Sequence, residues 1–131
     1  GTVGSLSPVL DGIRIRELQE IVRRVPVSDR VIRYAVSIAE ATRPGREKSA
    51  GFVNDFITWG AGPRASQYLI LGAKARAVLH GRFYVACEDI RALAFAVLRH
   101  RIMLNFSAEA EGISADTIIE KIIKAVPEPA A

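Results

Sequence analysis

The feature that most constrains this fold is a set of apolar stripes with helical spacing. The clearest stripe consists of Ile90, Leu93, Ala94, Val97 and Leu98, at positions i, i+3, i+4, i+7 and i+8. This spacing places the side chains on one face of an α-helix. The other stripes lie at 13–24, 28–42, 63–80 and 114–126. Amphipathic helices must bury their apolar faces against one another, so the pattern predicts a mainly α fold, a bundle of about five helices.

Particular side chains are expected to form the buried faces of these helices. They are Leu18, Ile21, Val22 and Val25 in the first helix, Val31, Ile32, Ala35, Val36 and Ala39 in the second, Leu69, Ile70, Ala73, Ala77 and Val78 in the third, and Ile118, Ile119, Ile122, Ile123 and Val126 in the last. Pro26 is expected to end the first helix and Gly81 to cap the third, because proline interrupts a helix and glycine adopts the left-handed conformation at a helix end.

Two short segments have the character of strands. Residues 57–59 are rich in strand-forming side chains, and residues 101–106 alternate, with Ile102, Leu104 and Phe106 on one side. Each is the other's only evident partner, so the sequence allows a small two-stranded ribbon. Residues 43–51 are interpreted as a solvated, mobile loop and residues 109–112 as a polar turn.

Length and composition favour one domain. The chain has 131 residues, of which 50% are hydrophobic, enough for a core of its own. We expect a linker or expression remnant at 1–8, the helical domain at 9–126 and a flexible C-terminal tail at 127–131. No apolar run approaches the roughly 20 residues of a membrane helix. The single cysteine, Cys87, is expected to be a small buried residue in a cytoplasmic protein, with a catalytic thiol as the remote alternative.

The net charge of +4 is modest, and the basic residues are scattered in pairs. Such pairs are typical of solvated helix faces, and the aromatic residues do not alternate with them as they do in single-strand binders. Nucleic acid is therefore not the expected partner. His80 and His100 are the only histidines, so we predict no metal site.

One junction, Gly60-Ala61-Gly62-Pro63-Arg64, has the character of a binding site. Pro63 suits the first turn of a helix, which places Arg64 beside unpaired backbone N–H groups at the positive end of the helix dipole. A cation is unfavourable there unless an anion is bound, and helix N-termini and arginine both bind phosphate. The alternative is a solvated arginine at a loop-to-helix junction.

The sequence contains no complete catalytic motif. Lys48 and Ser49 do not belong to a Walker A loop, because Gly45 and Gly51 are misplaced for it. Neither an acidic strand end suited to magnesium nor a nucleophile elbow is present. A domain with one phosphate-directed arginine and no other candidate catalytic group is expected to be part of a larger protein or assembly.

The residues together resemble the C-terminal lid of the MoxR family of AAA+ ATPases. The segments that carry the resemblance are Leu18–Val27, Gly60–Ala65, Gly81–Arg82, Tyr84–Val85, Glu88–Ile90 and Val97–Arg101, and the resemblance extends from about Val9 to Val126. Ala86 departs from the pattern, since the family usually has a Thr or Ser cap there. Losing such a cap costs roughly 1 kcal/mol.

The resemblance implies a helical lid that follows an α/β domain carrying Walker A, Walker B, the first sensor and the arginine finger. Arg64 would be the sensor 2 arginine, in a turn supported by Gly60, Gly62 and Pro63, and would approach the γ-phosphate of ATP in its own or a neighbouring subunit. ATP and Mg²⁺ would bind the full-length ATP hydrolase, while this fragment alone would bind neither and would not be catalytic. The implied partners are its own N-terminal core, neighbouring subunits of a hexameric ring and, in chaperone-like work, von Willebrand A-domain proteins.

Two interpretations from other classes stay open. One is a stand-alone helical interaction or nucleic-acid-binding module, whose recognition helix would present Gln67, Lys74 and Arg76, a thinly charged face. The other is a structural oligomerisation domain. Trp59 is expected to pack in the core, with the lining of a nucleotide cleft as its alternative.

Overall fold

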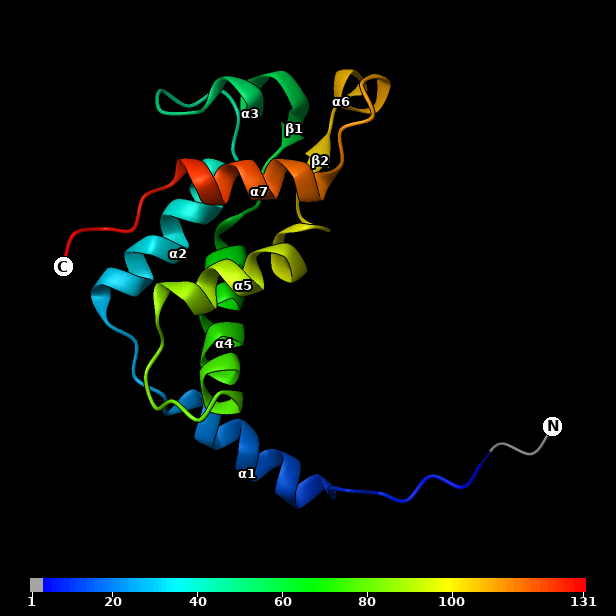
Figure 1. The fold of residues 1–131 in the computed structure, drawn as a ribbon, viewed down its shortest axis with the longest axis vertical. Coiled ribbons are helices and arrows are strands. Elements are labelled where there is room, and N and C mark those ends of the chain that lie inside the picture. The colour runs from blue at the N-terminus through cyan, green and yellow to red at the C-terminus, as the bar shows by residue number, and fades with distance from the viewer. Residues whose placement is uncertain (1–3) are drawn as a thin grey trace.

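The computed structural model describes residues 4–131, and Figure 1 shows the arrangement of its elements. In chain order they are α1 (Gly12–Arg23), α2 (Asp29–Ala41), α3 (Gly51–Phe56), β1 (Ile57–Trp59), α4 (Pro63–Leu79), α5 (Cys87–Leu98), β2 (Met103–Leu104), α6 (Phe106–Ala110) and α7 (Ala115–Ala125). The predicted mainly α class is confirmed. No helix of residues 4–131 has both the length and the apolar character needed to cross a membrane.

Two of these helices, α3 and α6, were not expected from the sequence. Each has only five or six residues, which is too short to form a repeating apolar stripe. Asn105 accepts a hydrogen bond from the backbone N–H of Ala108 and so caps α6, whose last two residues fall within the polar turn predicted at 109–112. Its side-chain amide also donates to the carbonyl of Asp55 in α3. Tertiary contacts therefore stabilise these helices more than local propensity does.

The predicted two-stranded ribbon is confirmed. β1 and β2 pair antiparallel, with Ile57 opposite Leu104 and Trp59 opposite Met103 across an irregular register. The second strand is shorter than the alternation suggested, because Phe106 already begins α6. The expected placement of Phe106 on the strand face beside Leu104 was therefore wrong.

Helix α4 is the centre of the core, and α2 and α5 pack against it (Figure 1). Leu69, Ala73 and Ala77 of α4 are fully buried, as predicted. Gly72 lets α5 come close, since a Cβ added there would lie 2.8 Å from Leu93 Cδ1. Helix α7 covers α2 and α5 with Ile118, Ile119 and Ile122.

The core face of α2 is rotated from the predicted one. Val31, Ala35 and Ala39 are buried as expected, but Tyr34 and Ile38 complete the face. Ile32 and Val36 are partly exposed instead. Helix α2 packs against α4, α5 and α7, and this broad contact decides which of its apolar residues are covered.

Helix α1 differs most from its prediction. None of its residues is buried, and Leu18 and Ile21 are 43% and 49% exposed. It lies across the end of α4, where the Lys74 ammonium donates to the carbonyl of Arg23 at 3.0 Å. The amphipathic pattern correctly predicted a helix, but the described residues provide too few neighbours to cover its apolar face.

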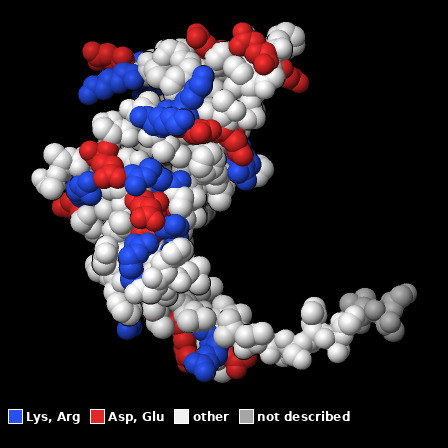
Figure 2. All heavy atoms as spheres, in the orientation of Figure 1, with Lys and Arg blue, Asp and Glu red and all other residues white. Residues whose placement is uncertain are grey.

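An apolar groove runs between α1 and α4 as a result. It is lined by Leu10, Ile15, Leu18 and Val22 from the α1 side, with Tyr68 and Leu71 of α4 opposite. Figure 2 shows the corresponding hollow as a largely uncharged surface. The groove is an exposed apolar surface of a kind that usually contacts another protein part.

Both polar segments that were expected to be mobile make defined contacts. In residues 43–51, Ser49 Oγ donates to the Arg43 carbonyl at 2.7 Å, and Gly45 N–H donates to Asn54 at 2.8 Å. These hydrogen bonds give the loop a defined path. In the tail, the Glu128 carboxylate accepts hydrogen bonds from Arg30 and Arg91.

Candidate functional site

The predicted site residues lie together in the turn between β1 and α4. Gly62 is the N-cap of α4, Pro63 its first residue and Arg64 its second. Gly62 offers no side chain to cap the helix, and the first turn contains no acidic residue. Pro63 has no N–H and the Ala65 N–H donates to the Gly62 carbonyl at 3.0 Å, which leaves the N–H and the guanidinium of Arg64 as groups suited to an anion.

The Arg64 side chain is exposed. Within residues 4–131 no ion pair includes Arg64, and the buried carboxylate of Asp89 is bound by Arg76 and Arg82 at the other end of α4. The guanidinium is therefore available to a group that this chain does not contain. That geometry is common to the phosphate-binding and the solvated interpretation of Arg64.

The turn is held in place by the C-terminal end of α2. The backbone N–H of Ala61 donates to Thr42 Oγ1 at 2.8 Å, and Arg43 Nε donates to the Ala61 carbonyl at 2.8 Å. Thr42 is fully buried, and its hydroxyl also donates to the carbonyl of Ala39 at 2.6 Å. Both polar groups of Ala61 are thus satisfied by two consecutive residues, the C-cap of α2 (Thr42) and the residue that follows it (Arg43).

The close approach of the turn to Thr42 and Arg43 requires a glycine at position 60. A Cβ added at Gly60 would lie 2.5 Å from the carbonyl oxygen of Thr42 and 2.6 Å from the Cα of Arg43, both of them backbone atoms. The sequence analysis missed Thr42 and Arg43, because these contacts span 18 and 19 residues and leave no local pattern.

Trp59 does not pack in the core, so that expectation was wrong. It is 68% exposed and lies opposite Met103, which is exposed as well. The ribbon has one buried position in β1, at Ile57, and Trp59 falls outside it. Trp59 therefore extends the exposed surface next to the turn that carries Arg64.

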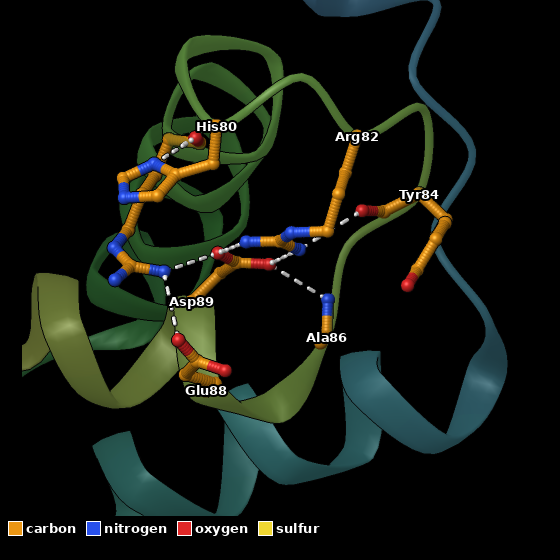
Figure 3. A network of polar contacts seen from close by, with 7 residues as sticks. His80, Arg82, Tyr84, Ala86, Glu88 and Asp89 are labelled. Carbon is orange, nitrogen blue, oxygen red and sulfur yellow. Dashed lines mark hydrogen bonds and ion pairs between the residues drawn. The ribbon is translucent and has the colours of Figure 1, made fainter.

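A second polar cluster lies at the other end of α4, around the buried carboxylate of Asp89 (Figure 3). One oxygen of Asp89 accepts from Arg76 Nη1 and Arg82 Nη2, each at 2.6 Å. Its other oxygen accepts from Arg82 Nη1 at 2.7 Å and from the Ala86 backbone N–H at 2.8 Å. Burial alone would raise the pKa of this carboxyl, but the hydrogen bonds from Arg82, Ala86 and Arg76 outweigh it and hold that pKa far below its ordinary value.

Local structure brings these groups together. Gly81, with φ +72°, ends α4 as predicted, and the N–H of Arg82 bonds back to the Ala77 carbonyl at 2.9 Å. This is the Schellman arrangement, which turns the chain so that Arg82 meets Asp89. The start of α5 lacks a capping side chain at Ala86, and the Asp89 carboxylate holds the Ala86 N–H instead.

The Asp89 cluster is about 20 Å along α4 from Arg64, because the helix rises 1.5 Å per residue. Every oxygen of the carboxylate is occupied by donors of this chain. The cluster therefore joins the α4–α5 connection to both helices, and it offers no free group for catalysis.

Other candidate residues are accounted for within the fold. Arg76 and Lys74, two of the three polar residues of the imagined recognition helix, bind Asp89 and the Arg23 carbonyl. Figure 2 shows acidic and basic side chains interspersed on the visible face. Cys87 is buried as predicted, and burial raises the pKa of its thiol. Across residues 4–131, no three His, Cys, Asp or Glu side chains gather as metal ligands.

Comparisons with known proteins give a consistent result. The family model described as the AAA lid domain matches residues 50–122, which include the Arg64 turn. Over 86% of the present chain, the sequence is 34% identical to the chaperone MoxR1 of Mycobacterium tuberculosis. Over 92% of the present chain, it is 32% identical to the protein MoxR of Methylorubrum extorquens. A crystal structure of a candidate ATPase from Cytophaga hutchinsonii superposes with a TM-score of 0.85 and 36% identity over 90% of the chain.

The chain spans about a third of the length of these relatives. It covers 30% of MoxR1, 37% of MoxR and 36% of the solved ATPase chain. The shared region is thus one part of longer proteins.

Proposed function

The chain belongs to the AAA lid domain family, as a lid of the MoxR type, and we propose that it couples ATP binding and hydrolysis in a longer AAA+ ATPase to movement of the lid. The observation that carries this proposal is the exposed guanidinium of Arg64 at the start of α4, inside the region that the family model matches. The core domain of the longer protein supplies the remaining nucleotide contacts.

Arg64 is the residue that senses the nucleotide in this proposal. Its fork of N–H donors forms charge-assisted hydrogen bonds to the terminal phosphate, which tie the lid to the occupied core. When that phosphate leaves, the bonds are lost and the lid is released. ATP with Mg²⁺, when bound by the core, supplies the phosphoryl group and the negative charge that the Arg64 guanidinium would bind.

The packing of the lid turns this local event into a larger movement. Helix α4 begins at the sensing residue and forms the centre of the core that α2 and α5 cover. Because protein interiors are close-packed, a displacement of the α4 start is passed to the whole helical unit. The apolar groove between α1 and α4 is the surface on which the core domain rests.

The wider setting is proposed from the same relatives. MoxR1 bears the name of a chaperone, and we assign a chaperone-like remodelling role to the protein that contains this chain. A cytoplasmic ring, with six subunits and von Willebrand A-domain partners, is the assembly in which that role would be exercised.

The test is the ATPase activity of the full-length protein with Arg64→Ala. Loss of one donor aimed at developing charge typically lowers turnover by about 100-fold, and we expect a loss of this order. Arg33→Ala is the matched control, since Arg33 is an exposed arginine on α2 away from the turn. Turnover of the Arg64→Ala protein equal to that of the control would remove Arg64 from the mechanism.

A further inference from the structure

The C-terminal end of α2 is joined to the Arg64 turn by hydrogen bonds to both backbone polar groups of Ala61. Ala61 is almost fully buried, and its N–H and its carbonyl are both bound by side chains of consecutive residues, Thr42 and Arg43. A buried backbone group that loses its partner is destabilised by its full desolvation cost. The two hydrogen bonds therefore restrict the turn to one path.

Further contacts fix Arg43 itself. The Arg43 carbonyl accepts from Ser49 Oγ at 2.7 Å, and Ser49 Oγ in turn accepts from the Arg46 backbone N–H at 3.0 Å. Gly60 lies directly against the backbone of Thr42 and Arg43, which leaves no space for displacement toward α2. The turn is thus fixed by hydrogen bonds on one side and by backbone packing on the other.

The position of Arg64 depends on this arrangement. Only Gly62 and Pro63 separate Ala61 from Arg64, and Gly62 has no side chain with which to fix the helix start by itself. A change in the path of Ala61 therefore moves the first turn of α4. Misplacement of a reacting or charge-stabilising group by about 1 Å can lower a rate by about 100-fold.

We propose that Thr42 and Arg43 are positioning residues, which hold Ala61 so that Arg64 meets the bound nucleotide in a single orientation. This inference rests on the proposed function of Arg64. Thr42 and Arg43 act through the turn and make no contact of their own with the nucleotide. The C-terminal end of α2 thus contributes to nucleotide sensing by positioning Arg64.

The experiment measures ATP turnover and KM of the full-length protein with Thr42→Val and Thr42→Ser. Valine keeps the shape of threonine but cannot accept from the Ala61 N–H, whereas serine keeps the hydroxyl. We expect Thr42→Val to lower kcat about tenfold, which corresponds to about 1.4 kcal/mol, and Thr42→Ser to stay near wild type. Ser28→Ala is the control, because it removes a side-chain hydrogen bond to Val31 at the opposite end of α2.

The decisive measurement is Thr42→Val in the Arg64→Ala background. If Thr42 acts through Arg64, the valine substitution has no further effect on kcat once Arg64 is gone. An equal loss in both backgrounds would show a general structural role and overturn the inference. If kcat falls for Arg64→Ala but not for Thr42→Val, the inference alone is overturned. If turnover is unchanged for Arg64→Ala, the proposed function is overturned, and the inference with it.

Arg43→Lys provides a second variant, should Thr42→Val reduce folding. Lysine keeps the positive charge and a flexible stem but lacks the Nε–H that binds the Ala61 carbonyl. We expect the same pattern, a loss of kcat about tenfold that disappears in the Arg64→Ala background. A melting temperature measured for each protein separates loss of fold from loss of position.

Discussion

Replacement of Asp89 by Asn tests the buried cluster that joins α4 to α5. The substitution keeps the size of the side chain but removes the charge that Arg76 and Arg82 face at 2.6–2.7 Å. Removing one partner of a buried ion pair typically costs about 3–5 kcal/mol, because the remaining charge is left uncompensated. A domain of ordinary stability unfolds with about 5–15 kcal/mol, so the loss is a large share of the total.

The assay is thermal and urea unfolding of the 131-residue chain at pH 7, followed by circular dichroism. A loss of this size lowers the melting temperature by roughly 10–20 °C in a domain of this length. Asp116→Asn is the matched control, since Asp116 pairs with Arg99 at 2.7 Å on the surface. Exposed pairs contribute little, and we expect the control to unfold close to wild type.

The pH dependence gives an independent check. The pKa of Asp89 is lowered in the folded chain, so its contribution to stability is present above the ordinary pKa of an aspartate and is lost as the pH falls through the folded pKa. Wild type should therefore lose stability below about pH 4, and Asp89→Asn should lose less over the same range. The reasoning about the cluster fails if Asp89→Asn unfolds like wild type at pH 7.

Two pairs of substitutions probe the turn and the exposed helix. Gly60→Ala should destabilise the chain by about 1–3 kcal/mol in urea unfolding, because its Cβ meets the backbone of Thr42 and Arg43. Gly62→Ala has open space and should be tolerated, and equal unfolding midpoints for the two variants would contradict the close approach at Gly60. Leu18→Gln on α1 should change the free energy of unfolding by about 0.5 kcal/mol or less, while Leu69→Ala in the core should cost about 2–5 kcal/mol. A large loss for Leu18→Gln would mean that α1 is buried in solution.

Much of the fold could be predicted because its signals are local. The stripes of α4, α5 and α7 repeat over several turns, and Gly81 marks a helix end by its own backbone conformation. The candidate turn was found for the same reason, since Gly62, Pro63 and Arg64 are adjacent in the sequence. The short helices α3 and α6 were missed because one or two turns carry no period.

The sequence by itself determined the five longer helices, the ribbon segments and the place of Arg64 at a helix start, because each depends on residues within a few positions of one another. Only the tertiary structure decided that α1 stays exposed, that Asp89 is buried between two arginines, and that Thr42 and Arg43 hold Ala61. The physical reason is that burial and hydrogen bonding depend on which surfaces meet in space. Such tertiary contacts join residues far apart in the chain, and the hydrophobic periodicity of a single segment does not predict them.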